Sequence, residues 1–376
     1  MDKAEKFIYE RLQQRADQGI LRVLSTAVLP IDFSSNDYLG FARSIELKAL
    51  TDIKLAEVLP YKNGATGSRL LNGNTAFTEE TEQLIATFHG AEAGLIFNSG
   101  YDANVGLLSS LAQRGDTIIA DELIHASLID GARLSYANRY TFRHNDLEEL
   151  EAKLKIAKGN IYVLTESVYS MDGDFALLTE INCLCKQYNA NLIVDEAHAV
   201  GLFGNHGSGR VQMLGIEHDV FARIVTFGKA LGCHGAIVLG SANLRAYLIN
   251  FARSFVYTTA LPLHSVTNIY SAYQMLIGTD YTEQIGSKIN QYLSLLKNTD
   301  IPRTDSRSAV QNVLFKDHFK AKAASRHLQN KGLDVRAILT PTVAKGTERL
   351  RICLHLFNSN QEIELLINEL MTLTHE

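Results

Sequence analysis

The stretch Ile224-Val225-Thr226-Phe227-Gly228-Lys229-Ala230-Leu231-Gly232 joins a short apolar, β-branched run to a lysine between two glycines. The run predicts a buried strand, and the glycines predict a tight turn directly after it. Lys229 then stands where the strand ends, so its amine can project into a cleft and form a Schiff base with a carbonyl compound. For this residue taken alone, a solvated surface lysine is the alternative interpretation.

A second stretch lies upstream, Asn191-Leu192-Ile193-Val194-Asp195-Glu196-Ala197-His198. A strand there would deliver Asp195 to the edge of a parallel sheet where ligands bind. A carboxylate at this place can hold the protonated pyridine nitrogen of pyridoxal 5'-phosphate, an electron sink for amino-acid carbanions. His198 can then hydrogen-bond the phenolic oxygen. Helix capping by Asp195 is the alternative, but Asp195, His198 and Lys229 in this order favour the cofactor.

Length and charge restrict the class of protein. A chain of 376 residues accommodates one large domain and a smaller one. The net charge is −5 with interspersed signs, so neither nucleic acid nor a membrane surface is an expected partner. The N-terminus lacks the apolar core of a signal peptide and no apolar run reaches the length of a membrane span, so a cytoplasmic location is expected. The spacing of Cys183 and Cys185 argues against zinc, and no metal site is predicted.

Predicted strands and helices alternate through the first two thirds of the chain. The strands are predicted at 93–98, 117–120, 140–142, 161–165, 192–195 and 236–239, and the intervening helices at 75–90, 125–137, 147–157 and 177–188. This alternation indicates an α/β fold with a mostly parallel sheet. Because right-handed crossovers bring the carboxyl ends of the strands to one edge, Asn98-Ser99-Gly100, the segment 166–170, Asp195 and Lys229 should converge there.

The flanking segments suggest two further units. An amphipathic helix over residues 4–24 is expected to pack on a partner subunit or on the second domain. One long helical region over 264–296 should bridge to a small α+β domain. That domain is predicted to hold strands at 310–315, 333–337 and 350–354 and helices at 318–331 and 360–374. We therefore predict an N-terminal arm over 1–45, a large domain over 46–275 and a small domain over 276–376.

Other polar positions indicate ligand contacts. Ser99-Gly100-Tyr101 opens a helix directly after a strand, which is a ready phosphate site because free N–H groups and the helix dipole point there. One of Arg349 and Arg351 is expected to clamp a substrate carboxylate, and the other to lie in solvent or in a surface ion pair. Asn36 alone would be an ordinary turn former. The loop Gly64 to Asn74 is either a connection or a ligand-contacting lid.

Together, these motifs resemble the α-oxoamine synthase family, which has the aspartate-aminotransferase-like fold (fold type I) with a large domain and a small C-terminal domain. The match covers nearly the whole chain, and the matching segments are Asn36 to Gly40, Gly67 to Asn74, Ser99 to Tyr101, His125 to Leu128, Ser170 to Gly173, Asp195 to His198, Thr226 to Lys229 and Gly346 to Arg351. Family members couple a small amino acid to an acyl thioester, with loss of carbon dioxide.

The resemblance implies a role for each matching residue. Lys229 would form the Schiff base, Asp195 would hold the pyridine nitrogen and His198 the phenolic oxygen. His125 would stack on the ring and act in catalysis with Lys229, and Ser170 would hydrogen-bond near the ring. The predicted phosphate ligands are Thr226, Ser99, Gly100, Tyr101 and, from the other subunit of a homodimer, Thr259. Asn36 and Arg351 would contact the substrate carboxylate.

The resemblance also suggests the substrates. Residues 225–229 and 257–262 are most similar to family members that join alanine to a pimeloyl thioester of coenzyme A or acyl carrier protein. Members that use glycine or serine remain alternatives, because these amino acids differ by one or two atoms. An aminotransferase on the same fold and a non-catalytic partner subunit are more remote alternatives, and the presence of Lys229 argues against the second.

Overall fold

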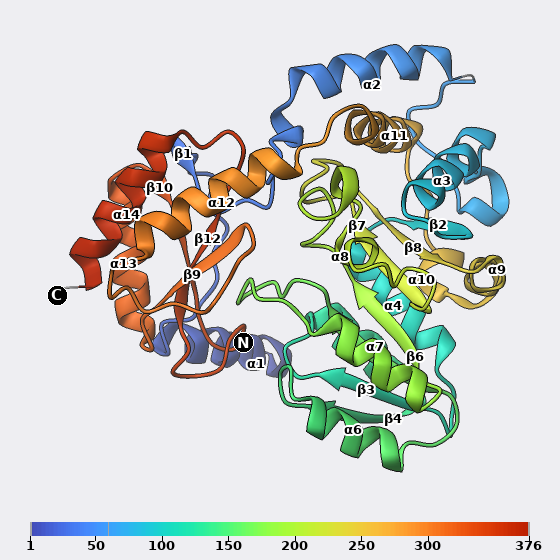
Figure 1. Cartoon of the computed structure of the whole chain (residues 1–376), viewed down its shortest axis with the longest axis horizontal. Coiled ribbons are helices and arrows are strands. Elements are labelled where there is room, and N and C mark those ends of the chain that lie inside the picture. The colour runs from blue at the N-terminus through green and yellow to red at the C-terminus, as the bar shows by residue number, and fades with distance from the viewer. Residues whose placement is uncertain (1, 59, 375–376) are drawn as a thin grey trace.

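The computed structural model describes residues 2–58 and 60–374. Figure 1 shows two parts, a large domain around one sheet and a small domain that holds the C-terminus. The large sheet has seven strands in the order β2-β8-β7-β6-β5-β3-β4. Their bounds are β2 (Ala93–Phe97), β8 (Ala236–Gly240), β7 (Ala222–Thr226), β6 (Asn191–Asp195), β5 (Ile161–Glu166), β3 (Thr117–Asp121) and β4 (Asn138–Phe142).

The sheet is mostly parallel and is covered on both faces. Strands β7, β6, β5, β3 and β4 are mutually parallel, whereas β8 runs antiparallel to both of its neighbours. Every residue of β3 and β5 is buried, because a parallel sheet between helix layers needs apolar side chains on both faces. One face packs against α4 (Gly100–Leu111), α5 (Ala126–Leu134) and α9 (Ala242–Phe251), and the other against α6 (Leu147–Ile156) and α7 (Leu178–Gln187).

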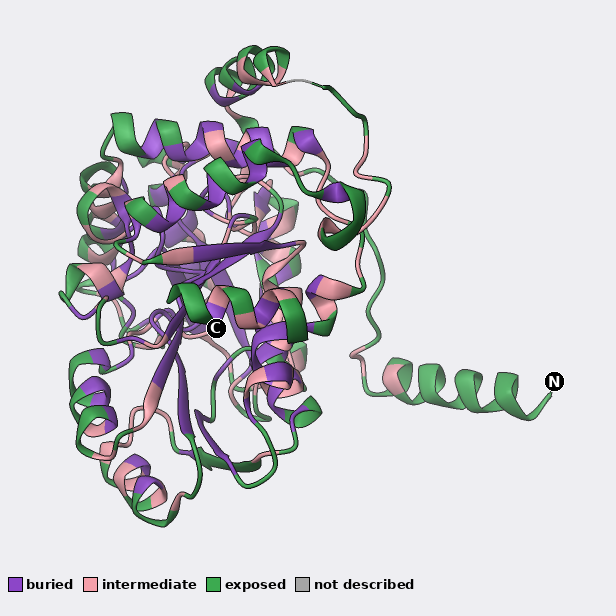
Figure 2. Cartoon of the chain, turned by 90° about the vertical axis from the view of Figure 1, so that its right-hand side faces the viewer, coloured by how far each residue is buried: buried purple, intermediate pink, exposed green. Residues whose placement is uncertain are grey.

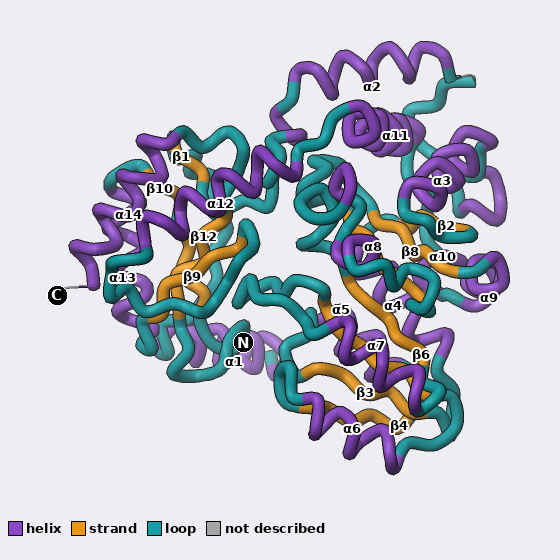
Figure 3. Tube along the Cα trace, in the orientation of Figure 1, coloured by secondary structure: helices purple, strands orange, loops and turns teal. Residues whose placement is uncertain are grey.

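The small domain contains an antiparallel sheet with helices packed on it (Figure 3). The strand order is β11-β12-β9, with β11 (Arg336–Ile338), β12 (Arg349–Cys353) and β9 (Val310–Leu314). Its helices are α12 (Thr282–Leu296), α13 (His318–Asn330) and α14 (Asn360–Thr374).

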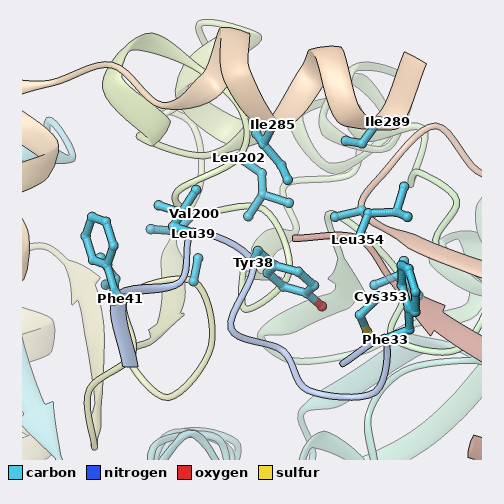
Figure 4. Packing of buried hydrophobic residues seen from close by; sticks show 14 of the residues in the cluster. Phe33, Tyr38, Leu39, Phe41, Val200, Leu202, Ile285, Ile289, Cys353 and Leu354 are labelled. Atoms are coloured by element: carbon cyan, nitrogen blue, oxygen red, sulfur yellow. The ribbon is translucent and has the colours of Figure 1, made fainter. Parts of the chain in front are cut away.

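The N-terminal segment is tied to this small domain. Strand β1 (Ile31–Asp32) pairs in parallel with β10 (Leu333–Asp334). In the turn that follows β1, Tyr38 packs between Leu202 of the large domain and Cys353 of the small domain (Figure 4). The segment that carries Asn36 is therefore held at the junction of the two domains.

The remaining helices complete the large domain and the arm. They are α1 (Lys3–Asp17), α2 (Ile45–Glu57), α3 (Ala76–Phe88), α8 (Arg210–Met213), α10 (Arg253–Val256) and α11 (Leu263–Gly278). Helix α1 stands away from the body of the molecule and has no buried residue (Figure 2). In the described parts of the chain, no helix is both long and apolar enough to cross a membrane.

Three predicted elements differ most from the structure. Helix α1 ends at Asp17 instead of residue 24, because the chain turns at Gly19 with a φ of 65°. The single helix predicted over 264–296 is two helices, and the carboxylate of Asp280 accepts the N–H of Thr282 at 2.9 Å where the second one begins. The strand predicted over 333–337 divides into β10 and β11, since Val335 donates its N–H back to Leu333 at 3.0 Å.

Candidate active site

The residues that the sequence singled out surround one edge of the large sheet. Strand β6 ends at Asp195 and β7 ends at Thr226. Strand β2 leads into α4 at Gly100, and β3 leads into the loop that carries His125. Because β2 and β7 both run antiparallel to β8, β2 is parallel to the other strands, and all these carboxyl ends lie on the same edge.

The backbone around Lys229 is a fixed turn after β7. The N–H of Gly232 donates to the carbonyl of Lys229 at 2.9 Å, and the N–H of Cys233 donates to the carbonyl of the buried Phe227 at 2.9 Å. Gly232 has a φ of 60°, and a Cβ at this position would lie 2.1 Å from the backbone nitrogen of Ala42. Only glycine fits this turn, which fixes the backbone directly after Lys229.

Lys229 starts a chain of hydrogen bonds that leads out to Asn36. The Nζ atom of Lys229 lies 2.7 Å from Nε2 of His198, and Nδ1 of His198 lies 2.7 Å from the hydroxyl of Tyr38. That hydroxyl donates to Oδ1 of Asn36 at 3.1 Å. The chain thus joins the predicted Schiff-base lysine to a predicted substrate contact through two buried rings.

The electrostatics favour a neutral His198 beside an easily deprotonated Lys229. Burial is the main cause that lowers the pKa of Lys229 to about 8, and the charge of Asp195 opposes this shift. Burial, followed by the charge of Lys229, holds the pKa of His198 well below its usual range. A neutral His198 that donates from Nδ1 to Tyr38 accepts at Nε2, so the amine of Lys229 is the donor in their hydrogen bond.

Asp195 is held as a buried, fully hydrogen-bonded carboxylate. Its Oδ2 atom accepts from the side-chain amide of Asn104 at 2.9 Å, and its Oδ1 atom accepts from the backbone N–H of Ala197 at 2.9 Å. The same Asn104 amide nitrogen lies 2.9 Å from the hydroxyl of Ser127. Both oxygens of the carboxylate are therefore held in place, as a partner for a cationic ring nitrogen requires.

His125 is fixed at the N-terminus of α5. Its Nδ1 atom accepts the backbone N–H of Ser127 at 3.2 Å and lies 2.7 Å from the Ser127 hydroxyl. Burial lowers the pKa of His125, and the charge of Asp195 opposes this shift. Because Nδ1 is used for capping, the ring has one fixed orientation, and its exposed part remains available to a ligand.

The predicted phosphate site lies where β2 enters α4. Ser99 is the N-cap of α4, and its hydroxyl accepts the N–H of Asp102 at 3.1 Å and donates to the Asp102 carboxylate at 2.9 Å. Gly100 occupies the first helical position, where N–H groups have no intrahelical partner. A Cβ on Gly100 would lie 2.6 Å from the hydroxyl oxygen of Thr226, so glycine keeps the space between helix and strand open.

Two predicted phosphate ligands have other contacts in the single chain. The hydroxyl of Tyr101 donates to the carboxylate of Asp130 at 2.8 Å, and its backbone N–H lies in the first turn of α4, where N–H groups have no intrahelical partner. Thr259 is exposed, and its carbonyl accepts from the side chain of Asn98 at 2.9 Å. The predicted contribution of Thr259 from a second subunit stays a prediction.

Asn36, Ser170 and Arg351 are brought together at the domain junction. Arg351, on β12, donates from Nη2 to Oδ1 of Asn36 at 3.0 Å and from Nε to the carbonyl of Ser170 at 2.7 Å. The guanidinium is almost completely buried, and two of its nitrogens are committed to these contacts. A planar guanidinium fixed in this way presents its remaining N–H groups in a defined direction, which suits a carboxylate.

The expectation that Arg349 or Arg351 lies in solvent or in a surface ion pair is wrong. Both side chains are buried, because residues two apart on a strand point to the same face. Arg349 forms an ion pair with Asp172, which links the small domain to the loop after β5. The arginine pair therefore serves both domain contact and site geometry.

Sequence reasoning gave no role to three residues at this edge, Tyr38, Asn104 and Glu166, although it placed Glu166 there as part of the segment 166–170. Tyr38 belongs to the motif Asn36 to Gly40, but nothing local shows that its hydroxyl reaches a histidine 160 positions away. Asn104 lies inside α4 and reads as a surface amide. Glu166 ends β5 and stands beside Asp195 in the strand register.

Comparison with known proteins agrees with this arrangement. The family described as aminotransferase class I and II matches residues 30–370. An 8-amino-7-oxononanoate synthase of Emericella nidulans is 42% identical, and the alignment covers 96% of this chain and 94% of that one. A structure of serine palmitoyltransferase with pyridoxal phosphate is 27% identical with a TM-score of 0.90, covering 100% and 99%. The structure of 8-amino-7-oxononanoate synthase from Francisella tularensis is 27% identical with a TM-score of 0.76, covering 92% and 98%.

These similarities extend over nearly the whole length of each chain, and they confirm both the resemblance and the fold class drawn from the sequence. The chain belongs to the class I and II aminotransferase family and, within it, to the α-oxoamine synthases.

Proposed function

We propose that this chain condenses L-alanine with a pimeloyl thioester of coenzyme A or acyl carrier protein. The products are 8-amino-7-oxononanoate, carbon dioxide and the free thiol, and the reaction belongs to biotin biosynthesis. The observation that carries the proposal is the near full-length identity with the Emericella nidulans enzyme of that name. The Lys229, His198 and Asp195 arrangement at the sheet edge supplies the chemistry.

The residues at this edge fit pyridoxal 5'-phosphate. Asp195 is a hydrogen-bonded carboxylate that suits the ring nitrogen, and the amine of Lys229 loses its proton easily. The first turn of α4 is open at Gly100, where a side chain would meet Thr226. A helix N-terminus of this kind suits a phosphate dianion.

The other contacts follow from the same arrangement. His198 would hold the phenolic oxygen, and His125 would cover one face of the ring. Ser170 would hydrogen-bond near the ring. The phosphate would be bound by Thr226, Ser99, Gly100, the backbone of Tyr101 and, from a second subunit, Thr259.

The bound cofactor supplies an electron sink for the α-carbon of the amino acid. The chain's own residues then position the substrate and move the proton. Arg351 and Asn36 hold the carboxylate, and Nζ of Lys229 takes the α-proton. The α-carbon bonds to the acyl carbonyl carbon, the thiol leaves, the carboxyl group departs as carbon dioxide, and a proton returns to the α-carbon.

A homodimer is part of the proposal. Helix α1 exposes Phe7, Ile8 and Leu12 and has no buried residue in the single chain. An apolar stripe on a helix is usually buried against another surface. A second copy of the chain supplies such a surface, and it would also bring Thr259 to the phosphate.

Serine palmitoyltransferase activity is the second candidate, because its structure matches this fold with a TM-score of 0.90. Glycine C-acetyltransferase remains a third possibility within the family. The identities favour the alanine reaction, since 42% with an 8-amino-7-oxononanoate synthase exceeds 27% with the palmitoyltransferase.

The test offers alanine, glycine and serine in turn, each with pimeloyl-CoA, acetyl-CoA and palmitoyl-CoA. We expect thiol release, carbon dioxide and a product of the mass of 8-amino-7-oxononanoate with alanine and pimeloyl-CoA only. The Lys229→Ala variant is the control and should show none of these. Preferred turnover of serine with palmitoyl-CoA would assign the second candidate instead.

A further inference from the structure

Glu166 is a buried acid at the centre of the site to which the proposed reaction gives no role. It is the last residue of β5 and is 3% exposed. In the register of the two parallel strands it pairs with Asp195. Side chains at paired positions of neighbouring strands project from the same face of the sheet, so the two carboxyl groups are neighbours.

The surroundings of the two acids differ. Each oxygen of Asp195 accepts one hydrogen bond, from Asn104 and from Ala197. The Oε1 atom of Glu166 has no hydrogen-bond partner among the residues that the structure describes. A buried carboxyl group with one oxygen that has no hydrogen-bond partner takes up a proton more readily than a carboxyl group in which both oxygens accept hydrogen bonds.

Glu166 also differs from the structural acids of this chain. Glu82, which is equally buried, lies between the guanidinium groups of Arg69 and Arg245 and accepts the N–H of Ile96 at 2.8 Å. In the described residues, Glu166 takes part in no ion pair within the distance that defines one. The cost of burying a charge on Glu166 is therefore not offset by a cation in contact, whereas for Glu82 two arginines offset that cost.

The charged and titratable groups that face Glu166 come from four elements. They are Asp195 on β6, Lys229 after β7, Tyr169 after β5 and Arg351 on β12. Burial, followed by the charge of Asp195, raises the pKa of Glu166 to about 8. Lys229 and the backbone N–H groups of His125 and Ser170 act in the opposite direction and do not cancel the shift.

We propose that Glu166 and Asp195 form an unequal acid pair in which Glu166 carries the proton and Asp195 carries the negative charge. Glu166 is thus a positioning residue that leaves one anion, not two, facing the amine of Lys229. A second anion would hold that amine in its protonated form and slow its use as a nucleophile and base. The consequence for catalysis rests on the proposed function, but the location of the proton is a property of the chain.

The first test is infrared spectroscopy of the apoprotein. We expect a protonated carboxyl band near neutral pH that is lost in Glu166→Gln and persists in Asp195→Asn. In wild-type protein it should fade with a midpoint of about 8, and in Asp195→Asn at lower pH, because the neighbouring charge is gone. A band that persists in Glu166→Gln, or a midpoint in Asp195→Asn no lower than that of wild-type protein, would overturn the proposal. If Glu166→Gln does not fold, Glu166→Asp should shift the band, and an unshifted band would again refute the assignment.

The second test measures the titration of Lys229 in the same apoproteins by competitive amine labelling. Two coupled groups titrate over a broadened range, whereas a single group follows a simple one-proton curve. We expect the broadened curve in wild-type protein and the simple one in Glu166→Gln, while identical curves would contradict the pairing. Neither test uses pyridoxal phosphate. Failure of the wild-type protein to bind that cofactor would refute the proposed function and leave the proton assignment standing.

Discussion

The amine of Lys229 should be reactive at a pH where an ordinary lysine is almost fully protonated. Burial lowers its pKa from 10.5 to about 8, with Asp195 opposing the shift. At about pH 7.5 roughly a quarter of such amines are neutral, against about 0.1% for a pKa of 10.5. The structure thus predicts a more than 100-fold larger neutral fraction, in the form that attacks an aldehyde.

Competitive labelling of the apoprotein with trace acetic anhydride across a pH series measures this directly. The labelled peptide that contains Lys229 should follow a curve with a midpoint about 8. Lys48, with 74% of its side chain exposed, serves as an internal reference in the same sample. The method needs no cofactor, so it isolates the effect of the protein environment.

The matched perturbation is Asp195→Asn, which removes a charge and keeps the shape of the side chain. Because the charge of Asp195 raises the pKa of Lys229, its loss should move the midpoint to lower pH. A wild-type midpoint near that of the reference lysine would show that the amine is solvated. A shift to higher pH in Asp195→Asn would show that the two groups do not interact as the structure implies.

Three further predictions concern stability and cofactor binding. Glu82→Gln removes a buried anion from between the half-buried side chains of Arg69 and Arg245 and should lower the free energy of unfolding in urea by about 3–5 kcal/mol. Glu79→Gln, at an exposed carboxylate, should cost less than about 0.5 kcal/mol. Gly100→Ala places a Cβ 2.6 Å from a hydroxyl oxygen and should weaken pyridoxal phosphate binding at least about tenfold in an absorbance titration, while Gly286→Ala, with no atom within 4 Å, should not. Burial would lower the pKa of His144, but hydrogen bonds to two aspartates raise it to about 10. The contribution of protonated His144 to the free energy of unfolding should therefore be complete below the ordinary pKa of 6.5 and be lost as the pH rises through about 10. In urea unfolding across a pH series, His144→Gln should not show this loss of stability.

Much of the fold followed from local patterns. The alternation of apolar runs with helical periods predicted the strands of the large sheet and its mostly parallel direction, because each strand's composition reflects burial on both faces. The direction of the strands then placed Asp195 and Lys229 at one edge without any knowledge of distances. Helix ends and breaks were less predictable, since the break before Thr282 depends on one side chain, Asp280.

The sequence by itself determined which groups end the strands, and therefore that an acid, a histidine and a lysine meet where a ligand binds. Only the tertiary structure decided their protonation and orientation. Tyr38 reaches His198 across 160 positions, and Arg351 reaches Asn36 across 315. Burial and partner distance, which set a pKa, arise when segments remote in sequence pack together. For that reason, no single sequence motif could predict the neutral state of His198 or the proton proposed on Glu166.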